Sequence, residues 1–204
     1  MQNPTQPVVT LFGKHVALGP IHRGLIDINH AWINDLETSR FLKMQVMSME
    51  SEESWYETIA NGSDIVYFAI YEASTLRPVG GVNLHNIRKE DRTAELGIMI
   101  GEKSLRGKGY GTEAVRLMCD YGFNALGLNS IMLLTSGFNV AGQKAYEKAG
   151  FKEIGRRREA RWFAGSYWDD IYYDILASDF ESPVVRDIIL NGIHLPRSSS
   201  EAEQ

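Results

Sequence analysis

Short apolar runs bounded by glycine, proline or charged residues predict most of the strands in this chain, because such runs are typical of buried or half-buried β-structure. Three of them follow one another with only short turns between, which predicts an antiparallel meander. The meander consists of residues 65–72, 79–87 and 93–100. The other predicted strands are residues 15–19, 130–136, 154–163 and 167–176.

Apolar residues recur at helical spacing in the stretches between these strands. An imperfect pattern, broken by Asn and Asp, covers residues 25–42, and two clearer patterns cover 112–125 and 140–149. Ser48 is placed to cap a further helix that runs to Ala60. Because helix 112–125 lies between two strands, those strands must run parallel and be joined by a right-handed crossover. The pattern therefore predicts an α+β fold: a mixed, mostly antiparallel sheet of about seven strands with helices on both faces.

With 204 residues and 44% hydrophobic content, the chain can bury one sizeable core, which predicts a single domain. We assign residues 1–178 to that domain and residues 179–204 to a C-terminal extension, partly helical and then disordered. The helical part, 183–192, has an apolar face that pairs Val184 with Ile188 and Val185 with Ile189. This face must pack on the domain or on a second subunit, so the sequence leaves a homodimer as one of the two alternatives.

Charge and composition exclude several classes of protein. A net charge of −5 argues against nucleic-acid binding, which relies on Lys and Arg to neutralise phosphates. No run approaches the roughly 18 apolar residues of a membrane span, and the first residues lack the pattern of a signal peptide. The five histidines show no metal spacing, so no metal is expected. The one cysteine, Cys119, fits a buried packing role in a cytoplasmic protein.

A glycine-rich loop, Arg106-Gly107-Lys108-Gly109-Tyr110-Gly111-Thr112, connects the predicted strand 93–100 to the predicted helix 112–125. Glycines allow a sharp turn and a close approach to a ligand, and the first N–H groups of a helix have no intrahelical partner. Those free donors and the positive end of the helix dipole bind anions. Arg106 and Lys108 add positive charge. The loop therefore predicts a site for a phosphorylated cofactor.

The spacing within the loop excludes two common nucleotide motifs. A P-loop requires Gly-Lys followed by Ser or Thr, whereas Gly109 follows Lys108 here. A dinucleotide fingerprint needs a third glycine where Thr112 stands, and an acidic residue at the end of the next strand, which is absent from 131–136. The spacing that fits is Arg-x-x-Gly-x-Gly, formed by Arg106, Gly109 and Gly111.

This spacing resembles the pyrophosphate-binding loop of the GNAT N-acetyltransferase superfamily. Upstream, residues 94–100 look like the strand of that family that pairs with the pantetheine arm of acetyl-CoA. Downstream, residues 139–151 are similar to its second cofactor motif, an Asn followed by a short helix that ends in Gly-Phe. Residues 165–169 resemble a Gly-x-x-x-Asp signature of the branch that holds ribosomal-protein alanine acetyltransferases and spermidine acetyltransferases. These motifs, in the right order along the chain, carry the resemblance, which covers roughly residues 66–176.

The resemblance implies an acetyl-CoA-dependent enzyme without a metal. It implies cofactor contacts from the strand, the loop and the head of the second helix: Ile98, Met99, Ile100, Arg106, Gly107, Lys108, Gly109, Tyr110, Gly111, Thr112 and Asn139. Asn139 is also among the best N-cap residues. Tyr146 matches the tyrosine that lies beside the cofactor sulfur in many relatives and is the expected general acid. Glu95 is the expected base; an equally weighted reading makes it a cross-strand partner for a Lys or Arg.

The predicted reaction is direct transfer of an acetyl group to a primary amine, either a protein N-terminus or a small amine. The spermidine branch carries an acid-rich Glu-Glu-Pro stretch between its first two helices, and residues 43–49 of this chain depart from it, which puts polyamine specificity in doubt. The alternative is a non-catalytic module that binds CoA or regulates another protein. Asp169 and the arginines at 156–158 fit structural roles better than substrate or nucleic-acid contacts.

Overall fold

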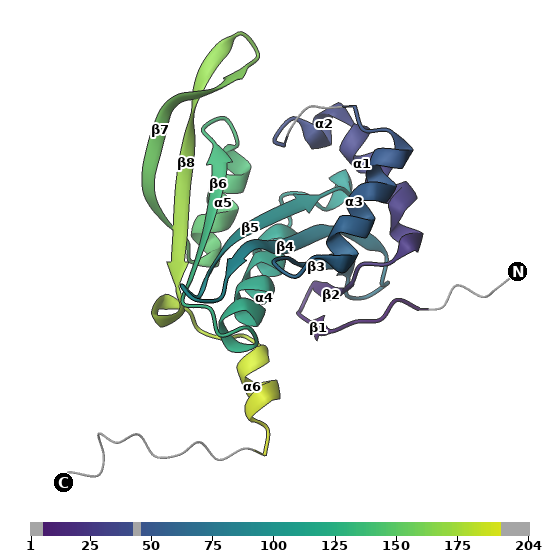
Figure 1. Ribbon diagram of the computed structural model, residues 1–204, viewed down its shortest axis with the longest axis vertical. Helices are drawn as coiled ribbons and strands as arrows, with labels where there is room; N and C mark the ends of the chain where they lie inside the picture. The colour runs from purple at the N-terminus through teal and green to yellow at the C-terminus, as the bar shows by residue number, and fades with distance from the viewer. Residues whose placement is uncertain (1–5, 43–45, 193–204) are drawn as a thin grey trace, which may run out of the picture.

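Eight strands form one sheet in the order β1-β2-β3-β4-β5-β6-β8-β7 (Figure 1). The computed structural model describes residues 6–42 and 46–192, so part of the 43–49 stretch, the first five residues and the expected disordered tail lie outside the described residues. Neighbouring strands are antiparallel except for β5 and β6, which run parallel as predicted. The strands are β1 (Leu11–Phe12), β2 (Val16–Pro20), β3 (Val66–Glu72), β4 (Pro78–Arg88), β5 (Thr93–Ile100), β6 (Ser130–Ser136), β7 (Lys152–Phe163) and β8 (Ser166–Leu176).

In addition to the seven predicted strands, the sheet has one very short strand. It is β1, whose two residues pair with Ala17 and Leu18 of β2. Two residues cannot show an alternating pattern, so the pairing of β1 depends on β2 rather than on its own sequence.

Side-chain caps explain where several helices begin. The predicted helix 25–42 is divided at Asp35, which is extended and whose carboxylate accepts a hydrogen bond from the Thr38 amide at 2.9 Å. Ser48 caps the next helix as predicted, by accepting from the Ser51 amide at 3.2 Å. The helices are α1 (Ile26–Asn34), α2 (Leu36–Ser39), α3 (Met49–Asn61), α4 (Tyr110–Asn124), α5 (Val140–Ala149) and α6 (Val185–Leu190), with 3₁₀ turns at Arg23–Leu25, Lys103–Leu105 and Ala177–Asp179.

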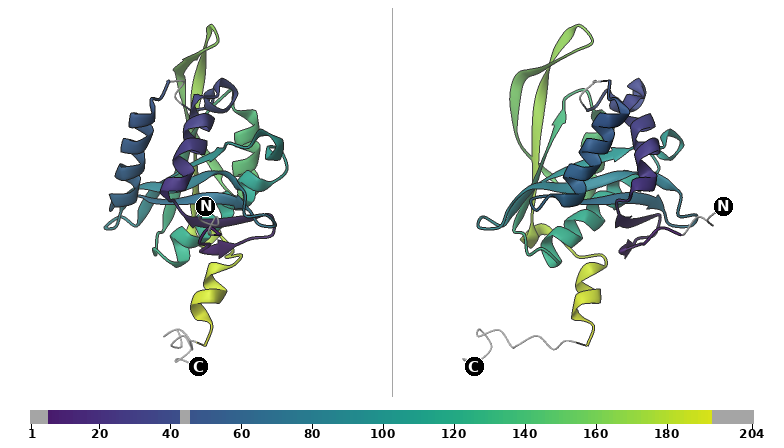
Figure 2. Two further views of the ribbon diagram at one scale, coloured as in Figure 1. Left: turned by 90° about the vertical axis from the view of Figure 1, so that its right-hand side faces the viewer. Right: turned by 45° about the vertical axis from the view of Figure 1, so that its right-hand side comes forward.

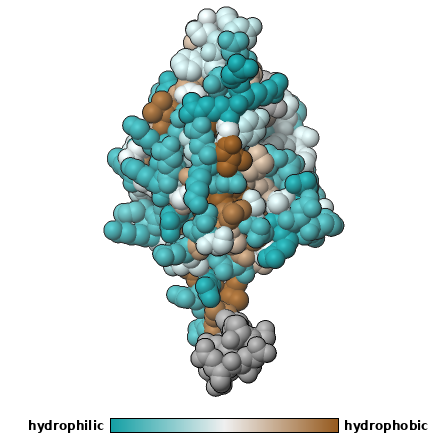
Figure 3. Space-filling view, turned by 90° about the vertical axis from the view of Figure 1, so that its left-hand side faces the viewer, coloured by the Kyte–Doolittle hydropathy of each residue, from teal (hydrophilic) through white to brown (hydrophobic). Residues whose placement is uncertain are grey.

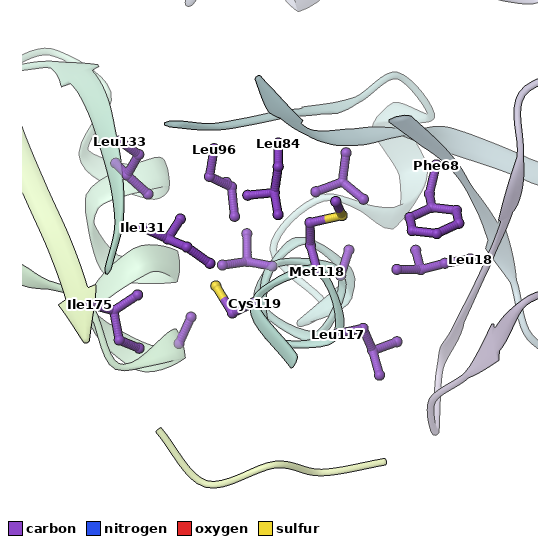
Figure 4. Close-up of a cluster of buried hydrophobic side chains, with 14 of the residues drawn as sticks. Leu18, Phe68, Leu84, Leu96, Leu117, Met118, Cys119, Ile131, Leu133 and Ile175 are labelled. Atoms are coloured by element: carbon purple, nitrogen blue, oxygen red, sulfur yellow. The ribbon is translucent and has the colours of Figure 1, made fainter. Parts of the chain in front are cut away.

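The main core lies between α4 and the sheet (Figure 4). Met118 and Cys119 of α4 are fully buried and face the strands that carry Leu84, Leu96 and Ile131. Burial raises the pKa of the Cys119 thiol, because a thiolate cannot be solvated there. Cys119 is therefore a packing residue, as the sequence predicted.

The other face of the sheet is covered by α1 and α3 (Figure 2), so helices occupy both faces as predicted. Trp55 of α3 packs edge-on against Tyr67 of β3 with ring centroids 5.3 Å apart. Glu52 of α3 is also buried, at 3% exposure, and burial raises its pKa. This face therefore combines aromatic packing with a buried carboxyl group.

Two segments stand out from the body of the domain (Figure 1). The β7–β8 hairpin is one, and its tip carries Trp162 and Tyr167, which are 63% and 61% exposed. The other is α6, which lies below α4 and packs through Val185, whereas Ile188 is 59% exposed. Only part of the predicted apolar face of this helix is covered within the described residues, and hydrophobic residues are visible beside the grey C-terminal residues in Figure 3.

Candidate functional site

The sheet opens between its two parallel strands. β5 and β6 pair only from Thr93 with Ser130 to Glu95 with Met132. Beyond Glu95, β5 remains paired with β4 up to Ile100, so its other edge carries backbone groups without a strand partner. Such an edge can hydrogen-bond an extended ligand in the manner of an added strand. Figure 1 shows β6 turning away from β5 at this point.

A cavity of about 910 Å³ lies at this opening. It is lined by most of the residues that the sequence singled out: Ile98, Met99, Ile100, Arg106, Gly107, Gly109, Gly111, Thr112, Asn139 and Tyr146. The three predicted site residues outside its lining are Glu95, Lys108 and Tyr110. A second hollow, of about 620 Å³, lies on the β7–β8 hairpin among Arg157, Arg158, Glu159 and Asp169, and it contains none of the predicted site residues.

The glycine loop gives the cavity an anion-binding wall. Gly107 and Gly109 have φ of +71° and +89°, and a Cβ added to either would meet nothing within 4 Å. Gly109 is the N-cap of α4, so the free amides of the first turn and the positive end of the helix dipole lie at the same place. The loop is therefore open to a ligand and rich in N–H donors, which suits a phosphate or pyrophosphate group.

Arg106 uses its guanidinium to fix this loop. Its Nε donates to the carbonyl of Ile100 at 3.0 Å, and Nη2 donates to the Thr38 hydroxyl at 2.8 Å. Nη1 also lies 3.8 Å from a carboxylate oxygen of Glu37. The sequence predicted a positive charge directed at phosphate; in the structure, most donors of this side chain instead tie α2 to the loop.

Neither Lys108 nor Tyr110 lines the cavity, although both belong to the glycine loop that forms one of its walls. The Tyr110 hydroxyl donates to the Glu72 carboxylate at 3.0 Å, which directs the ring toward β3. Thr112 does line the cavity, and its hydroxyl is 3.4 Å from the carbonyl of Ala145, so it links α4 to α5.

Asn139 has the capping role that its sequence position predicted. Its Oδ1 accepts from the Gly142 amide at 3.1 Å, and its Nδ2 donates to the Thr135 hydroxyl at 3.0 Å. Both ends of the amide group are therefore engaged within the fold. The cap fixes the start of α5 and with it the position of Tyr146, two turns further along the helix.

Tyr146 is half-buried at the cavity wall, where its ring packs against Phe151 and Tyr173. Burial raises the pKa of Tyr146 to about 12, because a phenolate would be poorly solvated there. Within the described residues, the hydroxyl makes no hydrogen bond. Tyr146 therefore presents a protonated, unengaged hydroxyl group to the cavity at neutral pH.

Glu95 lies on the opposite face of β5 from the α4 core and has partners on β4. Its Oε1 accepts from Asn86 Nδ2 at 3.0 Å, and its Oε2 lies 3.6 Å from His85 Nε2. His85 Nδ1 in turn lies 2.9 Å from Asn83 Oδ1. The cross-strand neighbour of Glu95 is thus a histidine rather than the Lys or Arg that one reading of the sequence predicted.

The sequence missed the walls that come from distant segments. An aromatic cluster joins the segment that follows α2 to the β7–β8 hairpin. The Phe138 ring stacks on Phe163 and Phe41, with ring centroids 4.3 and 6.0 Å apart, and Trp168 packs edge-on against it. Of this cluster, Phe41 lines the cavity, and the other lining residues outside the motifs include Lys14, Thr38, Leu42, Arg116, Pro183 and Val184. No local pattern marks these residues, because they are brought together only by the packing of separate elements.

Asp169, which the sequence singled out, and its neighbour Asp170 have structural roles. Asp170 is buried and accepts from Arg161 Nε at 3.0 Å, and Asp169 accepts from the Glu159 amide at 3.0 Å. Both interactions hold the irregular pairing of β7 with β8. In the part of the chain that the structure describes, no group of three potential metal ligands occurs, and no helix has the length and apolar character that crossing a membrane requires.

Comparison with known proteins agrees with the motifs. Residues 17–152 match the model of the acetyltransferase (GNAT) domain. The chain is 31% identical over 127 residues to YdaF of Bacillus subtilis, whose name assigns it provisionally to the ribosomal N-acetyltransferases; the match covers 62% of this chain and 67% of YdaF. It is 30% identical over 156 residues to human alpha/beta-tubulin-N-acetyltransferase 9, covering 71% of this chain and 75% of that protein.

The fold agrees as well. Spermidine N-acetyltransferase from Vibrio cholerae, solved in complex with CoA and spermine, superimposes with a TM-score of 0.74 at 26% identity, covering 81% of this chain and 97% of that one. The family match spans more than half of the chain, and it includes the β5 edge, the glycine loop and the Asn139 helix. The chain therefore belongs to the GNAT family of acetyl-CoA-dependent N-acetyltransferases.

Proposed function

We propose that this protein transfers the acetyl group of acetyl-CoA directly to a primary amine, either a protein N-terminus or a small amine. The observation that carries the proposal is that one cavity combines the glycine loop, the unpaired edge of β5 and the free hydroxyl of Tyr146. These three features match the three parts of the donor: its pyrophosphate, its amide-containing arm and its sulfur. The bound donor supplies an acetyl thioester, which is open to attack by an amine.

The chain binds and orients the donor through backbone groups. The backbone amides at the start of α4, which Gly107 and Gly109 leave accessible, donate hydrogen bonds to the pyrophosphate. The free edge of β5 around Ile98 and Ile100 pairs with the amides of the arm, although the carbonyl of Ile100 is already engaged by Arg106. This pairing fixes the thioester near Tyr146.

Tyr146 acts as the general acid. A leaving thiolate needs a proton or a hydrogen-bond donor. Because burial raises the pKa of Tyr146 to about 12, the hydroxyl keeps its proton throughout the neutral range and can donate it as the thiolate departs. Because an ordinary thiol, with a pKa of about 8.5, is a stronger acid than this phenol, the hydroxyl first stabilises the developing thiolate as a hydrogen-bond donor, and a proton that Tyr146 gives up is replaced from solvent.

Glu95 acts with His85 as the base. An amine is mostly protonated near pH 7, so it must lose a proton before or during attack. His85 Nδ1 faces Asn83 Oδ1 at 2.9 Å, which favours a hydrogen on Nδ1 and leaves Nε2 as an acceptor. Nε2 lies 3.6 Å from Glu95 Oε2, so the two groups can share a proton received from the amine through water.

Transfer is direct because the chain, in its described residues, places no cysteine at the cavity. Its single cysteine, Cys119, is fully buried in the α4 core and lies outside the cavity lining. A covalent acetyl-enzyme would need an activated nucleophile beside the thioester.

The acceptor side favours amines that are attached to larger molecules or carry apolar groups. Phe41 and Leu42 line the cavity on the α2 side, and Phe41 belongs to the aromatic cluster with Phe138. The exposed Trp162 and Tyr167 at the hairpin tip suit contact with a polypeptide. The names of the relatives, with ribosomal, tubulin and spermidine acceptors, span both acceptor classes.

A thiol-release assay with acetyl-CoA tests the proposal. Protein N-terminal peptides and polyamines serve as acceptors, and wild type is compared with Tyr146→Phe. We expect Tyr146→Phe to lower kcat by about 10²–10⁴-fold, the usual contribution of general acid catalysis, with the affinity for acetyl-CoA unchanged. Tyr56→Phe is the matched control, because Tyr56 is half-buried on α3 and lies outside the cavity.

The outcomes separate the alternatives. If none of the acceptors supports thiol release but the protein binds CoA tightly, the result would favour the non-catalytic binding module. A fall of less than about threefold in Tyr146→Phe would make this residue a packing group, since general acid catalysis contributes far more than that.

A further inference from the structure

A buried carboxylate on α4 holds the segment that follows the last strand. Asp120 is fully buried, and each of its oxygens accepts two hydrogen bonds. Oδ1 accepts from Ser182 Oγ at 2.5 Å and from Asn124 Nδ2 at 2.8 Å. Oδ2 accepts from the amides of Val184 and Val185 at 2.9 and 2.8 Å. Three of the four donors thus belong to the C-terminal segment.

Burial of such a charge is costly unless it is fully hydrogen-bonded. The four donors satisfy Asp120, and they do so only when residues 182–185 lie against α4. The carboxylate therefore couples the C-terminal segment to the body of the domain. Charge-assisted hydrogen bonds of this kind are about twice as strong as neutral ones, so the coupling is firm.

The same segment also reaches the cavity. Pro183 and Val184 line it, next to the hydrogen-bonded backbone of Val184. Just upstream, the Phe180 ring packs on Phe123 with ring centroids 5.2 Å apart. The Arg116 guanidinium lies over the Phe180 ring, with its Cζ 5.5 Å from the ring centroid. Arg116 Nη2 also donates to the carbonyl of Glu181 at 3.4 Å. The segment therefore supplies an apolar wall and orients one cation.

Three of the cations that line the cavity come from α4 and α5, namely Arg116 of α4 and Lys144 and Lys148 of α5. Arg116 lies seven residues after Gly109 on the same helix, which corresponds to about 10 Å along its axis. If the pyrophosphate of the donor lies at Gly109 and its pantetheine arm follows β5, the nucleoside of the donor lies on the side of Gly109 that faces away from β5. An adenine ring fits an apolar wall, and the 3′-phosphate of CoA fits a group of cations.

We infer that the C-terminal segment around Pro183 and Val184 is an integral wall of the donor site that recognises the adenosine 3′-phosphate end of CoA, with Asp120 as its positioning residue. This inference rests on the proposed acetyl-CoA chemistry of the cavity. It assigns a function to residues that lie beyond the last strand of the sheet and beyond the matched family domain.

The test compares two donors in the full-length protein. Acetyl-CoA carries the adenosine 3′-phosphate, and S-acetyl-4′-phosphopantetheine lacks it. In Asp120→Asn, one amide N–H₂ must face donors instead of accepting from them, which leaves buried N–H or O–H groups unpaired. We expect the KM for acetyl-CoA and the Kd for CoA to rise about tenfold with kcat unchanged, the pattern of lost ground-state binding. With the truncated donor, variant and wild type should have equal KM.

Asp187→Asn is the matched control, because Asp187 is exposed on α6 and outside the cavity. Equal losses with both donors in Asp120→Asn would show a general structural effect and overturn the inference, as would an unchanged KM for acetyl-CoA. If Asp120→Asn does not fold, Ser182→Ala removes one of the four hydrogen bonds and should raise the KM for acetyl-CoA alone, by about threefold. A wild-type protein that uses neither donor and binds no CoA would refute the proposed function instead.

Discussion

Gly109 offers a sharp test of the anion site, because the fold and the ligand respond differently to a methyl group there. Its φ of +89° is left-handed, and an added Cβ would meet nothing within 4 Å. Gly109→Ala therefore costs the fold only backbone strain, about 1–2 kcal/mol. For a chain of this size, each kcal/mol lowers the melting temperature by about 2–4 °C. We expect a fall of roughly 2–8 °C and a folded protein.

The matched control is Gly127, which has a φ of +69°, has no atom within 4 Å of an added Cβ and lies outside the cavity. Gly127→Ala should lose a similar amount of stability and bind CoA as wild type does. Gly111→Ala gives the converse comparison: the added Cβ would contact Ile100 Cγ1 at an ordinary 3.6 Å, within a helix. Because Ala is the better helix former, its melting temperature should hold or rise slightly.

The affinity for CoA should depend on whether the substituted glycine lines the cavity, and not on how much the substitution destabilises the fold. Gly109→Ala and Gly111→Ala both place a methyl group where the pyrophosphate approaches the amides, so we expect Kd to rise at least about tenfold, or ~1.4 kcal/mol. Scanning calorimetry measures the melting temperatures without ligand, and titration calorimetry measures Kd. The reasoning is refuted if both variants keep the wild-type Kd, or if Gly127→Ala weakens CoA binding as much as they do.

Two further predictions concern carboxyl groups on the face of the sheet opposite α4. Glu95→Gln should lower kcat by about 10²–10⁴-fold and change the acidic limb of the pH–rate profile. His85→Gln should give the same pattern if the two residues share a proton. Wild-type turnover of Glu95→Gln at every pH would remove Glu95 from the mechanism. Burial raises the pKa of Glu52 above its unfolded value, so its contribution to stability is complete at low pH and declines as pH rises through the folded pKa. Glu52→Gln should therefore raise the melting temperature at pH 8 and bring little gain at pH 4, whereas Glu53→Gln, at an exposed neighbour, should do neither.

The sequence by itself determined the features that depend on neighbouring residues. Strand and helix periods gave β3 to β8, α4 and α5 to within a few residues, and the caps Ser48 and Asn139 were visible because a cap acts on amides two or three positions away. The anion loop was equally local, since its glycines adjoin the helix whose amides they expose. The parallel pairing of β5 with β6 followed from chain order and handedness.

Only the tertiary structure decided what these side chains contact. Arg106 donates to Thr38, which is 68 residues away, and Asp120 binds Ser182 at a separation of 62 residues. Glu95 met a histidine rather than a Lys or Arg because the β4–β5 register, shifted near His85, set its neighbour. The local sequence pattern determines which helix or strand a segment favours. The choice of partner between elements depends on packing and on satisfying buried polar groups, which arise only after the chain has folded.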